Sequence, residues 1–497
     1  MPDYFISYED AEKNLLACSA YLAERIKSSD GHAEAMKTII PRYLGKQNVD
    51  LAAELANAVD DPFSRDQLLT MVAEKCAELG DDEYALQLVD AVEDQGMRAQ
   101  AHERVAVVMA HRGDTAKAAE IAETMAHPDF VYASIAVQQA GSGDESTANM
   151  TLDKIDFPTA RVSALLHMAS VAINDKEPEK AADLLQRAVD AAGEIEHDEE
   201  KIRTLCDIGN LFIEAGRNDA AINTFETARG LAEVLDNIHR DFFLVNCALG
   251  FLFAGSRDTA ERTLDLVMDK TQMGSALLGF ARDEWSKDKK EDALDTIEEA
   301  FAIVNSQREA ETRDRRSRNT LLSAISAQFA GFGRTDRAVE IAMLNPDPNE
   351  EMTALSQIAQ ILIIQKDDQQ ARETIDMIKE DATRLFGLLG LSDAKTKLGE
   401  AEAAATLLDD AASLADTVPQ LAARSSVLNQ IALRWVDHGQ MEKARQVTHE
   451  NLELITHIRD ESSRAVELAN LSSVRERSNL DLTEDEKAVL EKLTRNI

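Results

Sequence analysis

The 497-residue sequence has few residues that interrupt helices. It contains only 9 prolines and 21 glycines, and aromatic residues make up 5% of the chain. Proline and glycine are the residues that helix interiors tolerate least. Hydrophobic residues still amount to 44%, which is enough to form an extensive core. The composition therefore favours helix almost everywhere in the chain.

Cysteine and long apolar runs are also scarce. The four cysteines are widely separated and show neither metal-ligand spacing nor a disulfide framework, which is compatible with a reducing compartment. No stretch approaches the ~20 apolar residues of a membrane span. The amino-terminal segment is acidic and lacks the basic region and apolar run of a secretory signal. We expect a cytoplasmic protein that is not inserted in a membrane.

Positive charge is in short supply. There are 53 lysines and arginines against 91 aspartates and glutamates, which gives a net charge of −38. Such a chain repels phosphate backbones, so we expect no nucleic-acid partner. Two interpretations of the acidity stay open. It can provide solubility, including adaptation to a saline environment, or it can attract basic partners.

Motifs that carry chemistry are missing from the sequence. There is no phosphate-binding loop, no GxGxxG, no GxSxG and no HExxH. The closest histidine groupings, His102 with His111 and His449 with His457, do not have the i, i+4 spacing that places two ligands on one helical face. We therefore expect no enzyme activity, no metal site and no cofactor.

An alanine recurs along the chain, and in eight copies a glycine precedes it by five residues. Asp288, Lys176 and Lys366 replace the glycine in three further copies, and a copy around Gly45 and Ala52 carries two extra residues. Six of the eleven intervals between these framing alanines are 33 residues, and the others range from 30 to 45. The eight glycine and alanine pairs are Gly80/Ala85, Gly113/Ala118, Gly143/Ala148, Gly216/Ala221, Gly255/Ala260, Gly333/Ala338, Gly399/Ala404 and Gly439/Ala444.

A second small residue stands seven positions before each glycine, for example Ala73, Gly209 and Ser392. Small residues at both places let two helices cross closely. The glycine between them can end the first helix with a left-handed residue. An Asp or Asn often follows the glycine and can cap the second helix. The pattern predicts a series of helix pairs, here called helix A and helix B, with longer pairs where the interval reaches 39 to 45 residues.

These residues resemble the tetratricopeptide repeat family. The copy in residues 202–235 matches best, through Leu205, Ile208, Gly209, Phe212, Ala221, Phe225 and Ala228. The resemblance covers roughly residues 35–460 and implies an all-α fold, a right-handed α-solenoid of about twelve antiparallel helix pairs. We expect amino-terminal capping helices in residues 1–35, the array in 36–465 and a carboxy-terminal capping helix in 466–497, where Thr483 and Glu486 have capping-box spacing.

The resemblance also implies binding of a protein or peptide on a concave surface lined by helices A. Asn210 and Asn246 stand where two members of the family's carboxylate clamp would stand, and Arg203 lies on the same predicted helix as Asn210. The clamp lysine is replaced by Cys206, so the clamp is incomplete. We retain Arg203, Asn210 and Asn246 as candidate partner-binding residues.

One basic segment interrupts the acidic chain, in the longest repeat. Its arginines stand before or within the first turn of a predicted helix A, where cations oppose the helix dipole. They are either paired with neighbouring Glu309, Glu311 and Asp314, or form a docking patch for an anionic partner. The candidate residues of this patch are Arg313, Arg315, Arg316 and Arg318.

The leading hypothesis is a cytoplasmic adaptor or scaffold. Two alternatives remain at this point: a ligand-sensing array, as in bacterial regulators that resemble this pattern, and a structural subunit of a larger assembly. Such regulators usually carry a DNA-binding or nucleotide-hydrolysing domain, and no motif for either is present in this sequence.

Overall fold

The computed structural model describes residues 4–306 and 315–495, which fold into 28 α-helices. Two compact units are formed. Unit 1 contains residues 1–108 and 362–497, and unit 2 contains residues 109–361. Helices α7 (Gln95–His111) and α21 (Pro348–Ile364) run across the boundaries between the units.

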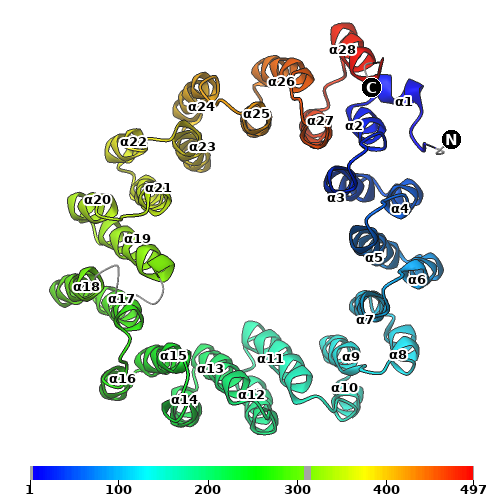
Figure 1. The fold of residues 1–497 in the computed structure, drawn as a ribbon. Coiled ribbons are helices and arrows are strands. Elements are labelled where there is room, and N and C mark those ends of the chain that lie inside the picture. Colours follow the sequence, from blue (N-terminus) through cyan, green and yellow to red (C-terminus); the bar gives the residue numbers. More distant parts are fainter. Residues whose placement is uncertain (1–3, 307–314, 496–497) are drawn as a thin grey trace. The chain divides into compact units, whose positions relative to one another are not determined.

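The other helices of unit 1 come from both ends of the chain (Figure 1). They are α1 (Tyr8–Lys13), α2 (Leu15–Ala23), α3 (Ser29–Gly45), α4 (Val49–Asn57), α5 (Pro62–Leu79), α6 (Asp82–Ala91), α22 (Asp368–Asp376), α23 (Asp381–Lys397), α24 (Ala401–Ala415), α25 (Leu421–Asp437), α26 (Met441–Thr456), α27 (Glu461–Ser478) and α28 (Glu484–Arg495).

Unit 2 is built from consecutive helices. They are α8 (Thr115–Ala122), α9 (Asp129–Gly141), α10 (Glu145–Leu152), α11 (Pro158–Asn174), α12 (Pro178–Gly193), α13 (Asp198–Glu214), α14 (Asn218–Glu233), α15 (Arg240–Phe253), α16 (Arg257–Leu264), α17 (Lys270–Ser286), α18 (Lys290–Asn305), α19 (Arg315–Gly331) and α20 (Thr335–Met343).

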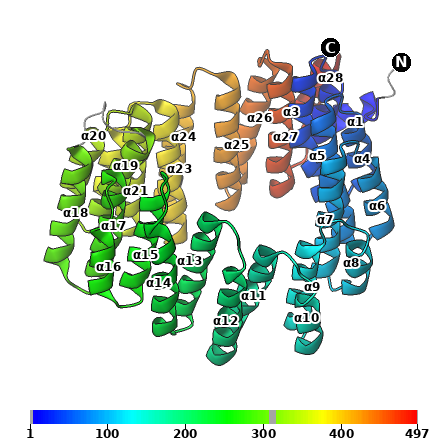
Figure 2. The ribbon, with the colours of Figure 1, turned by 60° about the horizontal axis from the view of Figure 1, so that its bottom comes forward.

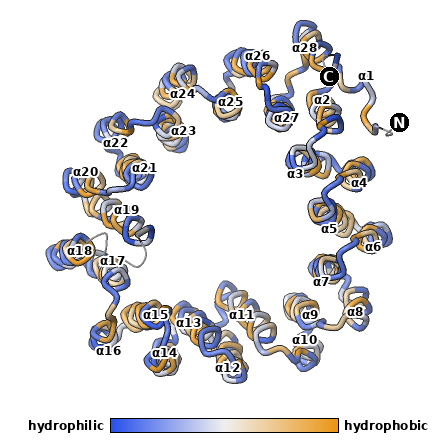
Figure 3. The backbone as a smooth tube through the Cα atoms, in the orientation of Figure 1, coloured by the Kyte–Doolittle hydropathy of each residue, from blue (hydrophilic) through white to orange (hydrophobic). Residues whose placement is uncertain are grey.

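Consecutive helices form antiparallel pairs, which confirms the predicted all-α repeat architecture. The odd-numbered helices from α3 to α25 are helices A and the even-numbered ones from α4 to α26 are helices B, so twelve pairs account for the twelve copies found in the sequence. Hydrophobic residues concentrate where the helices of a pair face one another (Figure 3). Each pair thus buries one stripe of each helix, as amphipathic helices do.

The framing alanines are buried as predicted. All of them from Ala85 to Ala404 lie in helices B and are 0% exposed. The small residues expected opposite them, such as Ala73 and Ser392, are also 0% exposed. The Ser392 hydroxyl donates to the Ala404 carbonyl oxygen at 3.0 Å, which shows directly that the two small positions of this pair meet. A larger side chain at either position would force the helices apart.

The turn between helix A and helix B places one residue in the left-handed region in every copy. The eight predicted glycines have φ between 69° and 99°. In the first copy our prediction was wrong: Gly45 lies inside α3, and Gln47, with φ of 59°, occupies the left-handed position five residues before Ala52. That copy therefore has the ordinary length. The turn geometry selects the position, and glycine is its most frequent occupant.

We expect Lys176→Gly to stabilise the chain. Lys176 has φ of 62°, a conformation in which an L side chain crowds the following carbonyl oxygen. Relief of this strain should exceed the added flexibility of glycine in the unfolded chain and raise the free energy of unfolding by about 0.5–1 kcal/mol. Urea unfolding measures the change. The reverse substitution Gly216→Lys, at φ of 71°, is the matched control and should destabilise. Equal stability of both variants would contradict the strain argument.

Helices B fall into two length classes, which explains the unequal repeat intervals. The short class has 8–10 residues, as in α6 and α10, and the long class has 15–16 residues, as in α12 and α18. The long helices precede the intervals of 39 to 45 residues. The extra length is therefore about two helical turns in helix B.

The first and last parts of the chain meet within unit 1. α27 packs against α25 and α26 on one side and against α2 and α3 on the other. It contacts α2 as extensively as helix A contacts helix B in the regular pairs (Figures 1 and 2). α27 and α2 are called here the terminal pair. They form one further repeat from two segments at opposite ends of the sequence.

Polar contacts also cross the terminal pair and its neighbour α3. The buried Ser19 hydroxyl donates to the carbonyl oxygen of Ala465, 446 residues away, at 2.7 Å. Arg42 on α3 donates from Nε to the carbonyl oxygen of Ala469 at 2.8 Å. The predicted caps, residues 1–35 and 466–497, also contact each other, because α1 and α2 pack against α28 and Arg495 donates to the Tyr8 hydroxyl at 3.0 Å. Their boundaries fall inside α3 and α27 and remain predictions.

Candidate functional site

Charge is unequally shared between the two helix layers. The twelve helices A carry 20 acidic and 20 basic residues, whereas the twelve helices B carry 31 acidic and 11 basic residues. The surface of helices A is thus balanced, and much of the net charge of −38 lies on helices B and in the loops. Helices A and B alternate along the whole sequence, so the difference in charge separates two layers of the fold and not two segments of the chain.

Within the twelve described helix pairs, the exposed aromatic side chains lie on helices A; Tyr4, Phe5, Tyr8 and Phe157 are exposed outside the pairs. Five phenylalanines on helices A are 43–60% exposed: Phe63, Phe130, Phe242, Phe253 and Phe386. On the described helices B the exposed large apolar residues are methionines, at 150, 343 and 441. Exposed aromatic groups on a surface with balanced charge are typical of protein-binding faces.

Three of these phenylalanines occupy the same repeat position. Phe130, Phe242 and Phe386 each stand eighteen residues before a framing alanine, and in the repeat of Ala221 this position holds Arg203. Arg203 is exposed on α13, and Asn210 is exposed two turns further along the same helix. Asn246 on the neighbouring α15 is half-buried. The structure therefore brings the candidates Arg203, Asn210 and Asn246 to adjacent helices A of unit 2.

The arginine segment is divided between different environments. Arg313 lies outside the described residues, as do Glu309, Glu311 and Asp314, and α19 begins with Arg315. Arg316 is exposed and lines an open pocket of about 670 Å³ together with Asn319 and Glu350. Arg318 is only 7% exposed, and its Nε donates to the Val304 carbonyl oxygen of α18 at 3.2 Å. Arg318 thus joins two helices within unit 2.

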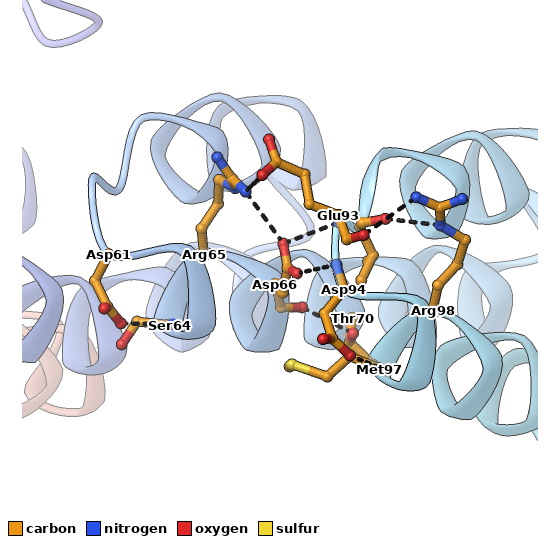
Figure 4. Close-up of polar contacts among 10 residues, drawn as sticks. Asp61, Ser64, Arg65, Asp66, Thr70, Glu93, Asp94, Met97 and Arg98 are labelled. Carbon is orange, nitrogen blue, oxygen red and sulfur yellow. Dashed lines mark hydrogen bonds and ion pairs between the residues drawn. The ribbon is translucent and has the colours of Figure 1, made fainter.

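A buried carboxylate holds one helix A to the next. Asp66 on α5 is 1% exposed and accepts hydrogen bonds from the backbone N–H groups of Glu93 at 3.3 Å and Asp94 at 2.9 Å (Figure 4). Asp94 in turn accepts from the Met97 N–H at 2.8 Å, within the first turn of α7. Asp66 thus satisfies backbone donors next to the start of the following helix A. We call this contact the carboxylate clasp.

The clasp recurs in unit 2. Asp129 accepts from the N–H groups of residues 156 and 157, and Asp241 accepts from those of residues 268 and 269. All three aspartates stand nineteen residues before a framing alanine, directly before the position of the exposed phenylalanines. This spacing was a signal that could have revealed the clasp from the sequence. The clasp fixes the spacing between helices A, and therefore between the side chains on their exposed surface.

We expect Asp66→Ala to destabilise unit 1 by about 1–3 kcal/mol, because two backbone N–H groups would lose a buried acceptor. Asp129→Ala is the matched control, since its N–H partners are exposed and water can replace the carboxylate. Its cost should be clearly smaller. Urea unfolding of the two variants gives the comparison, and an equal loss in both would show that burial does not set the cost.

Two features are absent from the described part of the chain. No group of three or more His, Cys, Asp or Glu residues in it is arranged to hold a metal ion. None of its helices is both long enough and apolar enough to cross a membrane.

Sequence comparison identifies the repeat. Residues 161–233, which span α11 to α14, match the family model of the tetratricopeptide repeat. The chain contains tetratricopeptide repeats. The match includes most of the copy that resembled the family best, and the remaining copies share its frame and pairing. No curated protein sequence matches the chain significantly.

Several solved structures are similar to the chain. Ton1535 from Thermococcus onnurineus NA1 is 17% identical, with 81% of this chain and 98% of that chain covered and a TM-score of 0.25. A putative kinesin light chain with nearly identical tetratricopeptide-like repeats, from Podosopora anserina, is also 17% identical, with 45% and 100% covered and a TM-score of 0.24. The Naa15/Naa10 complex bound to HypK-THB gives 13% identity, 97% and 81% coverage and a TM-score of 0.34.

Proposed function

We propose that this tetratricopeptide repeat protein is a non-catalytic cytoplasmic adaptor or scaffold, which binds a protein or peptide partner through the exposed surface of its helices A. The observation that carries the proposal is the contrast between the helix layers. Helices A combine balanced charge with exposed phenylalanines, whereas helices B are strongly acidic. Protein interfaces are enriched in aromatic side chains and depleted of charge at their centres.

The same contrast supports the interpretation that the acidity provides solubility. A net charge of −38 that resides largely outside helices A keeps the chain soluble and limits self-association. A partner that docks on helices A would meet little net charge. We therefore infer that partner binding depends mainly on apolar contacts, and that its rate changes only modestly with ionic strength.

In unit 2 we propose that Phe130, Phe242 and Arg203 contact the partner, with Asn210 and Asn246 as polar contacts beside them. The arginine segment remains a proposed additional contact. Arg316 is the residue suited to test it, because a charge reversal at the buried Arg318 would place a carboxylate beside the Val304 carbonyl group and disturb the fold.

The test begins with purification of the tagged chain from its native cells and identification of a stoichiometric partner by mass spectrometry. The double variant Phe130→Ser/Phe242→Ser should then weaken binding of that partner by about tenfold or more, as loss of aromatic interface residues usually does. Met150→Ser/Met343→Ser is the matched control, because it removes two exposed apolar side chains from helices B of the same unit. Its affinity should stay within about twofold of the native value.

Equal weakening by both double variants, or by neither, would refute the helix A surface as the binding face. A small metabolite that copurifies with an otherwise isolated chain would favour the sensor alternative instead. A large stable assembly in which helices B also contact other subunits would favour the structural subunit.

A further inference from the structure

Two buried cysteines meet in unit 2, although they stand far apart in the sequence. Cys206 on α13 and Cys247 on α15 have their Sγ atoms 3.9 Å apart. Cys206 is 6% exposed and Cys247 is 0% exposed. The helices are the A helices of consecutive repeats and pack directly against each other. The other two cysteines, Cys18 and Cys76, belong to unit 1.

The packing that brings the thiols together involves two glycines. Gly209 and Gly250 each stand three residues after one of the cysteines, and the ring of Phe225 lies against both. A Cβ atom at Gly209 would lie 2.6 Å from this ring and one at Gly250 would lie 2.4 Å from it, so no larger residue fits at either place. The ring is 0% exposed and forms an edge contact with Phe251, with ring centroids 5.9 Å apart. The two thiols therefore face each other one helical turn before the place where Gly209 and Gly250 pack against the Phe225 ring.

We propose that Cys206 and Cys247 form a modification site, at which a peroxide oxidises the two thiols to a disulfide that links α13 to α15. The slightly exposed Cys206 reacts first. Its thiolate attacks one peroxide oxygen, the O–O bond breaks, and water leaves after protonation, which makes a sulfenic acid. The Cys247 sulfur then attacks the sulfenic sulfur, the S–S bond forms, and the S–O bond breaks. The departing hydroxide takes the Cys247 proton as a second water.

The two thiols thus lose two electrons and two protons, and one peroxide becomes two waters. The sulfurs must approach from 3.9 Å to about 2.0 Å, which side-chain rotation and a small helix shift can supply. Its hydrogen bond with Cys206 and its burial both raise the pKa of the Cys247 thiol. Cys247 is therefore largely protonated at neutral pH, so its attack on the sulfenic sulfur should be slow and become faster as the pH rises.

The linkage would act on the proposed binding surface. α13 carries Arg203 and Asn210, and α15 carries Phe242 and Asn246. A covalent bond between the helices fixes the spacing of these side chains. This consequence rests on the proposed function, whereas formation of the disulfide does not, so the two ideas can fail separately.

The experiment treats the folded full-length chain with hydrogen peroxide at neutral and alkaline pH and removes the peroxide. The chain is then unfolded in the presence of an alkylating reagent, and its peptides are mapped by mass spectrometry without reduction. We expect a peptide that joins Cys206 to Cys247, a mass lower by two hydrogens, a fall from four alkylated cysteines to two, and full reversal by dithiothreitol. The Cys206→Ser variant should give no linked peptide. Retention of all four thiols, oxidation beyond sulfenic acid without a linked peptide, or linkage only after denaturation would overturn the proposal.

Discussion

Removal of residues 1–24 is expected to unfold α27 and α28 while α5 and α6, in the same unit, stay folded. The deletion removes α2, of whose nine residues eight are buried. The leucines Leu15, Leu16 and Leu22 alone represent roughly 5–9 kcal/mol of apolar burial, of which the entropy regained by the freed segment offsets a part. No other helix can replace α2. The helix that pairs with α27 comes from the other end of the chain, and the contacts of α27 with α25 and α26 are less extensive.

Hydrogen exchange measures this prediction helix by helix. Amide protection in α27 should fall by orders of magnitude in the deletion variant, while protection in α5 and α6 changes little. The control is Ser19→Ala, which removes one buried hydrogen bond across the terminal pair and should cost only about 1 kcal/mol. Native protection of α27 in the deletion variant would show that the terminal pair does not stabilise the end of the chain.

Glu486→Ala is expected to cost about 3–5 kcal/mol and to release α28. The Glu486 side chain is 0% exposed and is paired with the Arg475 guanidinium of α27, itself 6% exposed. Glu486 also completes the predicted capping box, since its Oε2 accepts from the Thr483 N–H at 2.8 Å and its N–H donates to the Thr483 hydroxyl at 3.3 Å. The substitution would leave a buried guanidinium without its carboxylate.

Thermal and urea unfolding measure the loss of stability. The double variant Arg475→Met/Glu486→Leu separates the two contributions, because it replaces the ion pair by apolar side chains of similar size. It should recover most of the loss, since buried ion pairs often contribute little net stability compared with apolar substitutes. A double variant as unstable as Glu486→Ala would indicate that the lost capping box, rather than the unpaired arginine, dominates.

The repeat frame could be predicted from the sequence because its signals are local. Ala221 and Gly216 are five residues apart, and their roles depend on the close crossing and on the left-handed turn within one pair. Gln47 was missed although its turn is equally local. The prediction relied on glycine, whereas the turn requires only a left-handed residue and tolerates other side chains at some cost.

Contacts between pairs were less visible in the sequence. Asp66 reaches backbone donors that lie 27 and 28 residues further along the chain. Cys206 and Cys247 stand fifteen and thirteen residues before their framing alanines, so the repeat frame alone does not align them. These contacts depend on how one helix A is displaced relative to the next, and unequal helix B lengths change that displacement from repeat to repeat.

The sequence by itself determined the all-helical class, the twelve pairs and the burial of the framing alanines, because each follows from residue spacing within about 40 residues. The tertiary structure alone decided three further features. It joined α2 to α27, placed Arg318 in a buried contact, and separated a charge-balanced helix A layer from an acidic helix B layer. The charge layers became visible once the helix bounds were known, whereas the two contacts share one physical reason. Packing between elements that are remote in sequence leaves no periodic trace in the chain, since such a contact is made once and needs only complementary shape, charge and hydrogen bonding at its own place.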